Sequence, residues 1–145
     1  MRNCSKEYVS NCRKRLLKYI PESGINFLDM ASGPIQYSEY VDYSKGFLKR
    51  YCVDLSSKAL EDAESRIGDH GVFLHGSFLD FDLEESFFDC TVSLHTIYHM
   101  DKDHQEKAVI KLLHVTKADK PVIIVYSNPF NIISKILFML RKFTG

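Results

Sequence analysis

Apolar and polar positions along the chain form two kinds of block, which predict strands and helices in alternation. Near-continuous apolar runs predict strands at 25–30, 50–55, 71–78, 87–96 and 121–127. Apolar residues that recur every three or four positions predict helices at 5–20, 56–67 and 101–117, with a shorter helix within 36–49. Strands of this kind, alternating with helices, are typical of a mostly parallel, twisted sheet that is covered on both faces.

The ends of the predicted helices carry start and stop signals. Pro21 is expected to stop the first helix, which is amphipathic. Ser56 is expected to cap the start of the helix at 56–67, and Gly68 follows the end of that helix. Asp101 or Asp103 is expected to cap the last helix. The apolar face of that helix is predicted to consist of Ala108, Val109, Leu112, Leu113 and Val115.

The composition is that of one globular domain. The chain has 145 residues, of which 45% are hydrophobic and 26% are charged. These values are ordinary for a single domain large enough to bury a core. We predict one domain over 1–145, made of an N-terminal helix (1–24), a core (25–128) and an apolar C-terminal helix (129–145).

Charge and cysteine usage narrow the classes of function. Lys and Arg together number 19, as do Asp and Glu, so the net charge is zero and no nucleic-acid partner is predicted. The absence of a C-x-x-C pair favours a reducing cytoplasm over a disulfide framework. The N-terminus lacks the apolar core of a signal peptide, and no run has the length of a membrane span. Nothing in the sequence indicates which oligomeric state the protein has.

Small, acidic, hydroxyl and aromatic residues gather just after the predicted strands. In strand order they are Asp29, Ala31, Ser32 and Gly33; Asp54 and Leu55; Ser77 and Phe78; and His95, Tyr98 and His99. In an open parallel sheet, ligands bind beyond the carboxyl ends of the strands, where these residues fall. The run FLDMASGPIQ is therefore either a tight turn or a loop on which a nucleotide-like ligand lies.

Asp54 stands 25 positions after Asp29, where nucleotide-binding folds often carry an acidic residue that binds a ribose. A carboxylate accepts hydrogen bonds from both ribose hydroxyls more strongly than a neutral group does. The alternatives are a helix cap and a solvent-facing charge. Given a parallel sheet, we favour the ribose.

Four segments, in order and spacing, resemble the motifs of class I S-adenosylmethionine-dependent methyltransferases. They are FLDMASGPIQ, YCVDLSSKAL, HGSFLDFDLEESFFDCTVSLHTIYHM and PVIIVYSNP. The resemblance is nearest to the group that contains small-molecule and quinone methyltransferases. It implies a three-layer Rossmann-like sandwich whose cofactor-binding core is 25–128, with S-adenosylmethionine as cofactor. It also implies methyl transfer to a small-molecule or lipid-linked acceptor.

The resemblance implies roles for individual residues. The loop under the methionine part of the cofactor would consist of Asp29, Ala31, Ser32 and Gly33. Asp54 would bind the ribose hydroxyls, and Leu55 would pack on the adenine. The adenine edge and the methionine end would be completed by Ser77, Phe78, Ser93 and His95.

The chain departs from the family pattern in its first loop and in its length. The family usually has glycine where Ala31 and Ile35 stand. At Ala31, alanine still lets a ligand approach the backbone closely if φ is negative. At Ile35, the side chain is expected to fill the position of the missing glycine by packing. The family often has Asp at the position of Ser77. Two further strands usually follow the fifth, and their apparent absence favours a fragment of a longer protein over a trimmed fold, because a bare strand edge promotes aggregation.

Two histidines are candidates for a general base. Methyl transfer needs alignment, exclusion of water and, for some acceptors, removal of a proton. His99 is the first candidate and His95 the second, since histidine titrates near neutral pH. Each is alternatively structural. Their spacing with His104 and Asp101 matches no standard metal site, so no metal is predicted.

Several alternatives stay open. One wall of a substrate pocket, or simple packing, is predicted for Tyr37, Tyr40 and Tyr43. Segment 130–143 is apolar with basic residues at its edge. It is predicted either to contact a membrane surface or the acceptor, or simply to cover the sheet. The fold also suits a non-catalytic binding or interaction module. An NAD-dependent oxidoreductase is less favoured, because the G-x-G-x-x-G loop is missing.

Overall fold

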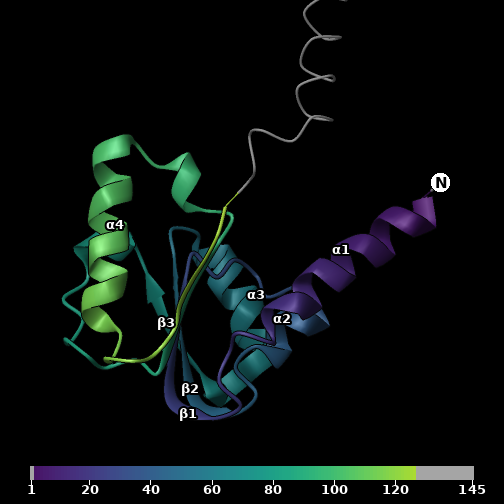
Figure 1. The fold of residues 1–145 in the computed structure, drawn as a ribbon, viewed down its shortest axis with the longest axis horizontal. Helices are drawn as coiled ribbons and strands as arrows, with labels where there is room; N and C mark the ends of the chain where they lie inside the picture. The colour runs from purple at the N-terminus through teal and green to yellow at the C-terminus, as the bar shows by residue number, and fades with distance from the viewer. Residues whose placement is uncertain (1, 127–145) are drawn as a thin grey trace, which may run out of the picture.

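The structure is a computed structural model that describes residues 2–126; residues 1 and 127–145 lie outside the described part. Its strands are β1 (Gly24–Met30), β2 (Phe47–Asp54), β3 (Gly71–His75), β4 (Cys90–Leu94) and β5 (Val122–Val125). Its helices are α1 (Arg2–Leu16), α2 (Ser38–Asp42), α3 (Ser57–Ile67) and α4 (Lys102–Val115). Its 3-10 turns are η1 (Gly68–His70), η2 (Phe78–Asp80) and η3 (Ile97–His99). Figure 1 shows their arrangement.

The described strands form one parallel sheet in the order β3-β2-β1-β4-β5. The chain begins at the centre with β1, runs outwards through β2 to β3, and then returns to add β4 and β5 on the other side. The direction therefore switches between β1 and β4. Ligands of such sheets bind at the carboxyl ends of the strands beside this switch point. The predicted α/β fold with a mostly parallel sheet is confirmed.

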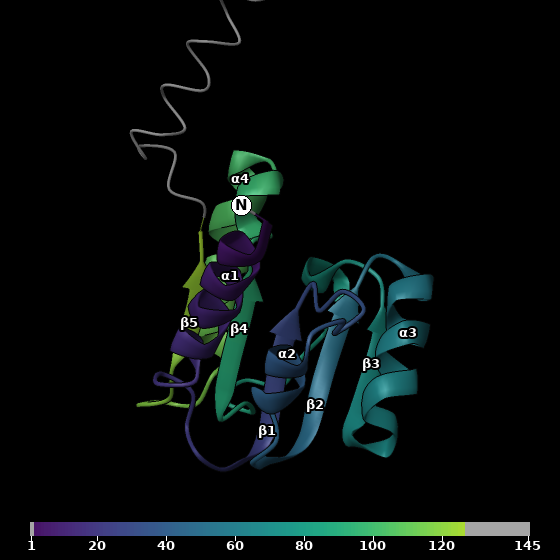
Figure 2. The same ribbon diagram turned by 90° about the vertical axis from the view of Figure 1, so that its right-hand side faces the viewer.

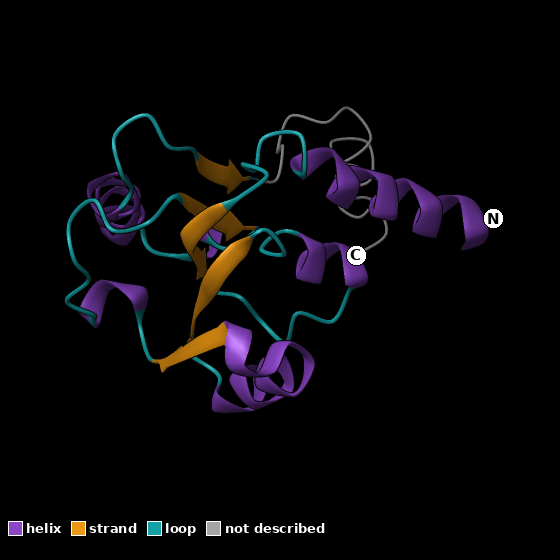
Figure 3. Ribbon diagram, turned by 90° about the horizontal axis from the view of Figure 1, so that it is seen from below, coloured by secondary structure: helices purple, strands orange, loops and turns teal. Residues whose placement is uncertain are grey.

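Helices cover both faces of the sheet, which confirms the three-layer sandwich (Figures 2 and 3). On one face, Phe27 of β1 and Val92 of β4 are buried in a cluster beneath α1 and α2. On the other, Leu28 and Met30 of β1 pack with Leu112 of α4. Successive residues of β1 thus point to opposite layers, as the two-residue period of a strand requires.

Helix α1 ends earlier than predicted, at Leu16 and not at Pro21. In residues 17–19, each backbone N–H donates to the carbonyl three residues earlier, which is the tightened pattern common in a last helical turn. Pro21 disfavours the helical conformation of the residue before it. That residue, Ile20, is buried in the core.

The other long helices follow the predicted boundaries closely. Ser56 Oγ accepts the N–H of Ala59 at 3.2 Å, and Gly68 ends α3 with a φ of +50°, so both predicted caps are confirmed. Asp101 stands at the first position before α4 but its side chain makes no capping bond. The predicted inward position of Leu113 is wrong: this residue is 60% exposed, because it lies one step around the helix from the buried stripe. The fully buried members of that stripe are Ala108, Leu112 and Val115.

Both β3 and β4 are shorter than predicted. β3 ends at His75, because Gly76 turns the chain with a φ of +149°. β4 begins after Phe88, which makes only an isolated bridge to Thr116. It ends before His95, whose φ is +58°. Apolar runs continue past these points because the turns also bury apolar side chains.

The cysteines in the strands are buried as predicted. Cys52 and Cys90 are both fully inaccessible to solvent. Burial raises the pKa of each thiol to about 12, so neither is a reactive thiolate at neutral pH.

The predicted C-terminal helix at 129–145 and the membrane contact at 130–143 lie outside the described residues. Among residues 2–126, no helix combines the length and the apolar character that crossing a membrane requires.

Asp89, just before β4, ties β1 to the segment after α4. Its Oδ2 accepts the backbone N–H groups of Ile25 at 2.8 Å and Asn26 at 3.0 Å, and its Oδ1 pairs with Lys117 Nζ at 2.7 Å. Burial by itself raises the pKa of this carboxyl, but the donors outweigh burial and hold the pKa below its usual value.

We expect Asp89→Asn to lower the free energy of unfolding by about 1–2 kcal/mol at neutral pH, because charge-assisted hydrogen bonds are lost. Since the folded pKa is the lower one, the contribution is present above the unfolded pKa of about 4 and is lost as pH falls through the folded pKa. Urea titrations at neutral and acidic pH measure it. The wild type and the variant should converge in acid; a difference that is independent of pH would contradict the assignment.

Candidate functional site

A cavity of about 90 Å³ opens at the carboxyl end of the sheet, beside the switch point. Its walls come from the ends of β1, β2 and β3 and from the turn after β4. We call it the strand-end cavity. Its lining includes Ala31, Asp54, Leu55, Ser77, Phe78 and Thr96. Residues predicted from three separate strand ends are therefore brought together.

The loop after β1 has an unusual backbone. The φ angle is +59° at Ala31, +58° at Gly33 and +49° at Ile35, all in the left-handed region. Ala31 therefore does not have the negative φ at which alanine permits close approach, and a side chain in this region costs roughly 1–2 kcal/mol that glycine avoids. A Cβ added at Gly33 would meet no atom within 4 Å, so the backbone there borders open space.

Ile35 fills its place by packing, as predicted. It is 1% exposed and belongs to a buried cluster with Cys52 and Leu60. A positive φ is rare for a β-branched residue, but burying such a side chain contributes about 1.5–3 kcal/mol, which offsets the strain. Strained loops held by their surroundings are common at ligand sites.

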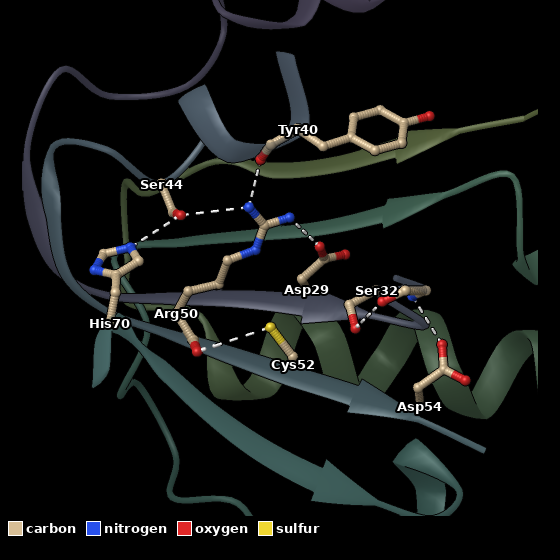
Figure 4. A network of polar contacts seen from close by, with 9 residues as sticks. Asp29, Ser32, Tyr40, Ser44, Arg50, Cys52, Asp54 and His70 are labelled. Atoms are coloured by element: carbon tan, nitrogen blue, oxygen red, sulfur yellow. Dashed lines mark hydrogen bonds and ion pairs between the residues drawn. The ribbon is translucent and has the colours of Figure 1, made fainter. Parts of the chain in front are cut away.

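Asp54 holds two loops with its two carboxylate oxygens, and Figure 4 shows its contact with the loop after β1. Oδ2 accepts the N–H of Gly33 and Oδ1 accepts the N–H of Ser56, each at 2.8 Å. The capping alternative is thus partly realised, because Ser56 begins α3. A carboxylate has about four acceptor positions, so each oxygen can still accept a hydroxyl from a ligand.

Asp29 makes a buried ion pair with Arg50, which Figure 4 shows beneath α2. Asp29 Oδ2 lies 2.5 Å from an Arg50 terminal nitrogen, and both side chains are inaccessible to solvent. Arg50 also donates to the carbonyl of Tyr40 and to Ser44 Oγ, and the latter lies 3.0 Å from His70 Nε2. Burial raises the pKa of the Asp29 carboxyl, and Arg50 opposes the rise.

This pair limits what Asp29 contributes to a ligand. Its side chain lies on the α1 face of the sheet and does not line the strand-end cavity. In the predicted cofactor loop, a ligand would therefore contact the backbone after Asp29 and not the Asp29 side chain. Ser93 lies on the opposite face, fully buried, and its hydroxyl has no partner among the described residues.

Lys111 of α4 fixes the turn that carries Phe78. Its Nζ donates to the carbonyl oxygens of Phe78 at 2.7 Å and Leu79 at 3.1 Å, and also to that of Phe81. The ammonium lies 5.1 Å from the centroid of the Phe78 ring. Ser77 begins the same turn, with its hydroxyl accepting the N–H of Leu79 at 3.3 Å. This wall of the cavity is thus held from the α4 side.

A second and larger cavity, of about 410 Å³, lies between α1, α2 and the ends of β4 and β5. We call it the α1 cavity. Its lining is mainly apolar and includes Val9, Leu16, Leu94 and Val125. Its polar groups come from Arg13, Tyr40, Tyr43 and His95. Two of the three tyrosines therefore form a cavity wall, which favours that interpretation over simple packing.

The two candidate histidines lie in different surroundings. His95 is exposed and lines the α1 cavity, and its backbone N–H donates to the carbonyl of Val125 at 3.0 Å. His99 lies on η3, exposed, with its ring 4.2 Å from that of Tyr98, and it lines neither cavity. Among residues 2–126, no group of three metal-ligating side chains is close enough to hold an ion.

Sequence reasoning missed several residues of both cavities. Thr96 and Met100 line the strand-end cavity, but neither has a charge or a motif that would mark it. Arg13 has no marking in the sequence, because its position depends on how α1 lies against α2. Lys111 carried no signal, since its partners are backbone carbonyls more than thirty positions away.

A scan against known protein families matches residues 28–124 to a methyltransferase domain. A search of curated protein sequences found no match. The matched segment includes all lining residues of the strand-end cavity, the whole of β2, β3 and β4, the end of β1 and most of β5.

Solved structures share the fold at low sequence identity. A SAM-dependent methyltransferase from Archaeoglobus fulgidus has a TM-score of 0.73 and 18% identity, over 92% of this chain and 58% of that one. The YcgJ protein from Bacillus subtilis has a TM-score of 0.67 and 18% identity, over 79% and 50%. Haemonchus contortus phosphoethanolamine N-methyltransferase 1, in complex with phosphoethanolamine and S-adenosylhomocysteine, has a TM-score of 0.68 and 11% identity, over 77% and 24%. The chain spans at most 58% of these proteins.

Proposed function

This chain belongs to the family of methyltransferase domains, and from that premise we propose that it binds S-adenosylmethionine at the strand-end cavity and methylates an acceptor in the α1 cavity. One observation carries the proposal: consecutive residues of the turn after β4 line the two cavities. Leu94 and His95 line the α1 cavity, whereas Thr96, the next residue, lines the strand-end cavity. A donor and an acceptor in these places would be neighbours.

The residues of the strand-end cavity fit the cofactor by their chemistry. Asp54 keeps acceptor positions free for ribose hydroxyls. Leu55, at the rim, is 75% exposed and offers an apolar surface to an adenine. Gly33 leaves open space beside the backbone for the methionine part. The enclosed volume of about 90 Å³ suits part of the nucleoside, so we assign the remainder to the loop.

The chain's own residues have the tasks of orientation and exclusion of water. When bound, S-adenosylmethionine supplies a methyl group on a sulfonium, which a nucleophile displaces in line. The α1 cavity has a size usual for small-molecule sites, about 410 Å³, and a mainly apolar wall. Such a wall keeps water from the reacting atoms.

We assign the proton-accepting role to His95, because it is the candidate histidine that lines the α1 cavity. An acceptor O–H or N–H would give its proton to His95 as the new bond to the methyl carbon forms. The electron pair of the broken carbon–sulfur bond stays on sulfur. His99 remains a second candidate, with less support from its position.

The acceptor is proposed to be a small molecule or a lipid-linked group with a substantial apolar part. The basis is the lining of the α1 cavity, in which aliphatic side chains and the rings of Tyr40 and Tyr43 predominate. This lining is not suited to a strongly hydrated acceptor.

Calorimetry with S-adenosylmethionine, S-adenosylhomocysteine and NAD tests the cofactor assignment. We expect the first two to bind and NAD not to bind. Binding of NAD alone would support the oxidoreductase alternative, and binding of none would support a non-catalytic module. Incubation with labelled S-adenosylmethionine and a panel of phenols and amines then tests for transfer.

We expect Leu55→Asp to weaken S-adenosylmethionine binding about tenfold, because it replaces apolar surface with a charge beside Asp54. Leu48→Asp is the matched control. Leu48 lies near the start of β2, the strand that Leu55 directly follows, and is 70% exposed, similar to the 75% of Leu55. Calorimetry should show a loss only for Leu55→Asp; equal affinities in both variants would separate Leu55 from the cofactor.

We expect Lys111→Met to weaken S-adenosylmethionine binding about three- to tenfold, because the three carbonyls that it binds lose their donor and the turn carrying Phe78 loosens. Lys107→Met, one helical turn earlier on an exposed position, should leave affinity unchanged. Calorimetry of both variants measures the effect. If the two behave alike, the turn does not depend on Lys111.

A further inference from the structure

The guanidinium of Arg13 is held over aromatic rings at the wall of the α1 cavity. Its central carbon lies 3.3 Å from the centroid of the Tyr37 ring and 5.4 Å from that of Tyr40. Arg13 is also one of the residues that line the cavity. Stacking on a ring covers the flat face of a guanidinium and leaves its N–H groups, which lie in its plane, free to donate.

Two hydrogen bonds fix the helix that presents Arg13. The hydroxyl of Tyr43 donates to the backbone carbonyl of Arg13 itself at 2.8 Å. Ser10 Oγ, three residues earlier, donates to Glu39 of α2 at 2.5 Å. Tyr43 is fully buried, so its hydroxyl is a firm anchor. The guanidinium is therefore placed by the fold and does not simply extend into solvent.

Among the described residues no carboxylate forms a close ion pair with this guanidinium, since none lies within 4.0 Å of it, and Glu39 acts on it only from a longer distance. Glu39, the acid on the neighbouring helix, accepts hydrogen bonds from Ser10 and Ser38. No acidic side chain lines the α1 cavity, and segments 1–5 and 127–145 contain no Asp or Glu. Arg13 is thus a fixed cation beside an apolar cavity.

We propose that the acceptor in the α1 cavity carries an anionic group, a carboxylate or a phosphate, which Arg13 binds. This inference rests on the proposed function. A guanidinium binds such groups with paired, charge-assisted hydrogen bonds, and an apolar wall strengthens the attraction by keeping water away. The acceptor therefore has an apolar body, an anionic group at Arg13 and an O–H or N–H nucleophile toward His95.

Matched small probes test the charge requirement. With S-adenosylhomocysteine present, titrate 4-hydroxybenzoate, phenyl phosphate and the neutral 4-hydroxybenzamide into the wild type, Arg13→Gln and Arg15→Gln. We expect at least one anionic probe to bind the wild type about tenfold more tightly than the amide. Arg13→Gln should abolish that preference. Arg15→Gln should keep it, because Arg15 is exposed and does not line the cavity.

The outcomes separate this inference from the proposed function. If S-adenosylmethionine does not bind the wild type, the proposed function fails. If it does bind, three results would each contradict the anionic acceptor. The amide could bind as tightly as both anions, or no anion could bind at millimolar concentration. Arg13→Gln could also keep the preference for the anion. Vesicles containing phosphatidic acid, compared with phosphatidylcholine vesicles, distinguish a lipid phosphate from a free one: an Arg13-dependent preference for the former would assign the anion to a lipid.

Discussion

Replacing Asp29 by alanine is expected to lower the free energy of unfolding by about 3–5 kcal/mol. The variant leaves the Arg50 guanidinium buried without its partner, and Arg50 is inaccessible to solvent in the folded protein. Arginine does not lose its proton to escape this cost. Urea denaturation followed by circular dichroism measures the change. We also expect S-adenosylmethionine to bind the fraction that stays folded, since the Asp29 side chain does not line the strand-end cavity.

Two control variants test whether the stability lost in Asp29→Ala comes from the unpaired buried charge of Arg50. Asp62→Ala breaks an exposed pair with Lys58, and should cost less than about 1 kcal/mol. The double variant Asp29→Leu, Arg50→Met removes both buried charges, and should recover most of the stability lost in Asp29→Ala. A small loss in Asp29→Ala, similar to that of Asp62→Ala, would show that Arg50 finds water or another partner.

Replacing Asp54 by alanine is expected to weaken S-adenosylmethionine binding about 10- to 100-fold, the range for hydrogen bonds to a charged group. Two effects contribute. The ribose hydroxyls lose their acceptor, and the N–H groups of Gly33 and Ser56 lose theirs, so the loop is less well ordered. Calorimetry measures the total.

A ligand without the hydroxyls separates these two effects. The wild type should bind S-adenosylhomocysteine more tightly than its 2′-deoxy analogue, whereas Asp54→Ala should hardly distinguish them. Asp54→Asn, which keeps one acceptor oxygen, should fall between the two. If Asp54→Ala discriminates as strongly as the wild type, Asp54 acts only by holding the loop around Gly33.

The sheet and the place of the site could be predicted from the sequence because both depend on local signals. Each strand is a short apolar run; the cavity residue Asp54 ends one of them, and Ser77 lies two positions after the end of another. The role of Asp29 could not be predicted in this way. Its partner Arg50 lies in β2, and the two meet only in the register that pairs Asp29 with Cys52. A carboxylate at a strand end looks the same whether it binds a ligand or an arginine.

The backbone angles of the loop after β1 could not be predicted from the sequence either. Ala31 and Ile35 both adopt a conformation that residue preferences argue against. What compensates is tertiary packing, because Ile35 is buried beneath α3. Likewise, a spacing of four suggests that His95 and His99 share a surface, but the chain between them is a kink and a 3-10 turn and not an α-helix, so they separate.

The strand order also has a kinetic consequence. β1, β2 and β3 are joined by short crossovers, whereas β4 pairs with β1 only when Phe27 meets Cys90 across a long intervening segment. We expect β4 to pair with β1 late in folding, because closing that long loop costs entropy. The strand-end cavity takes walls from both halves, with Asp54 on one side and Thr96 on the other. A ligand that needs both walls cannot help the transition state form, so it should slow unfolding and leave the folding rate unchanged.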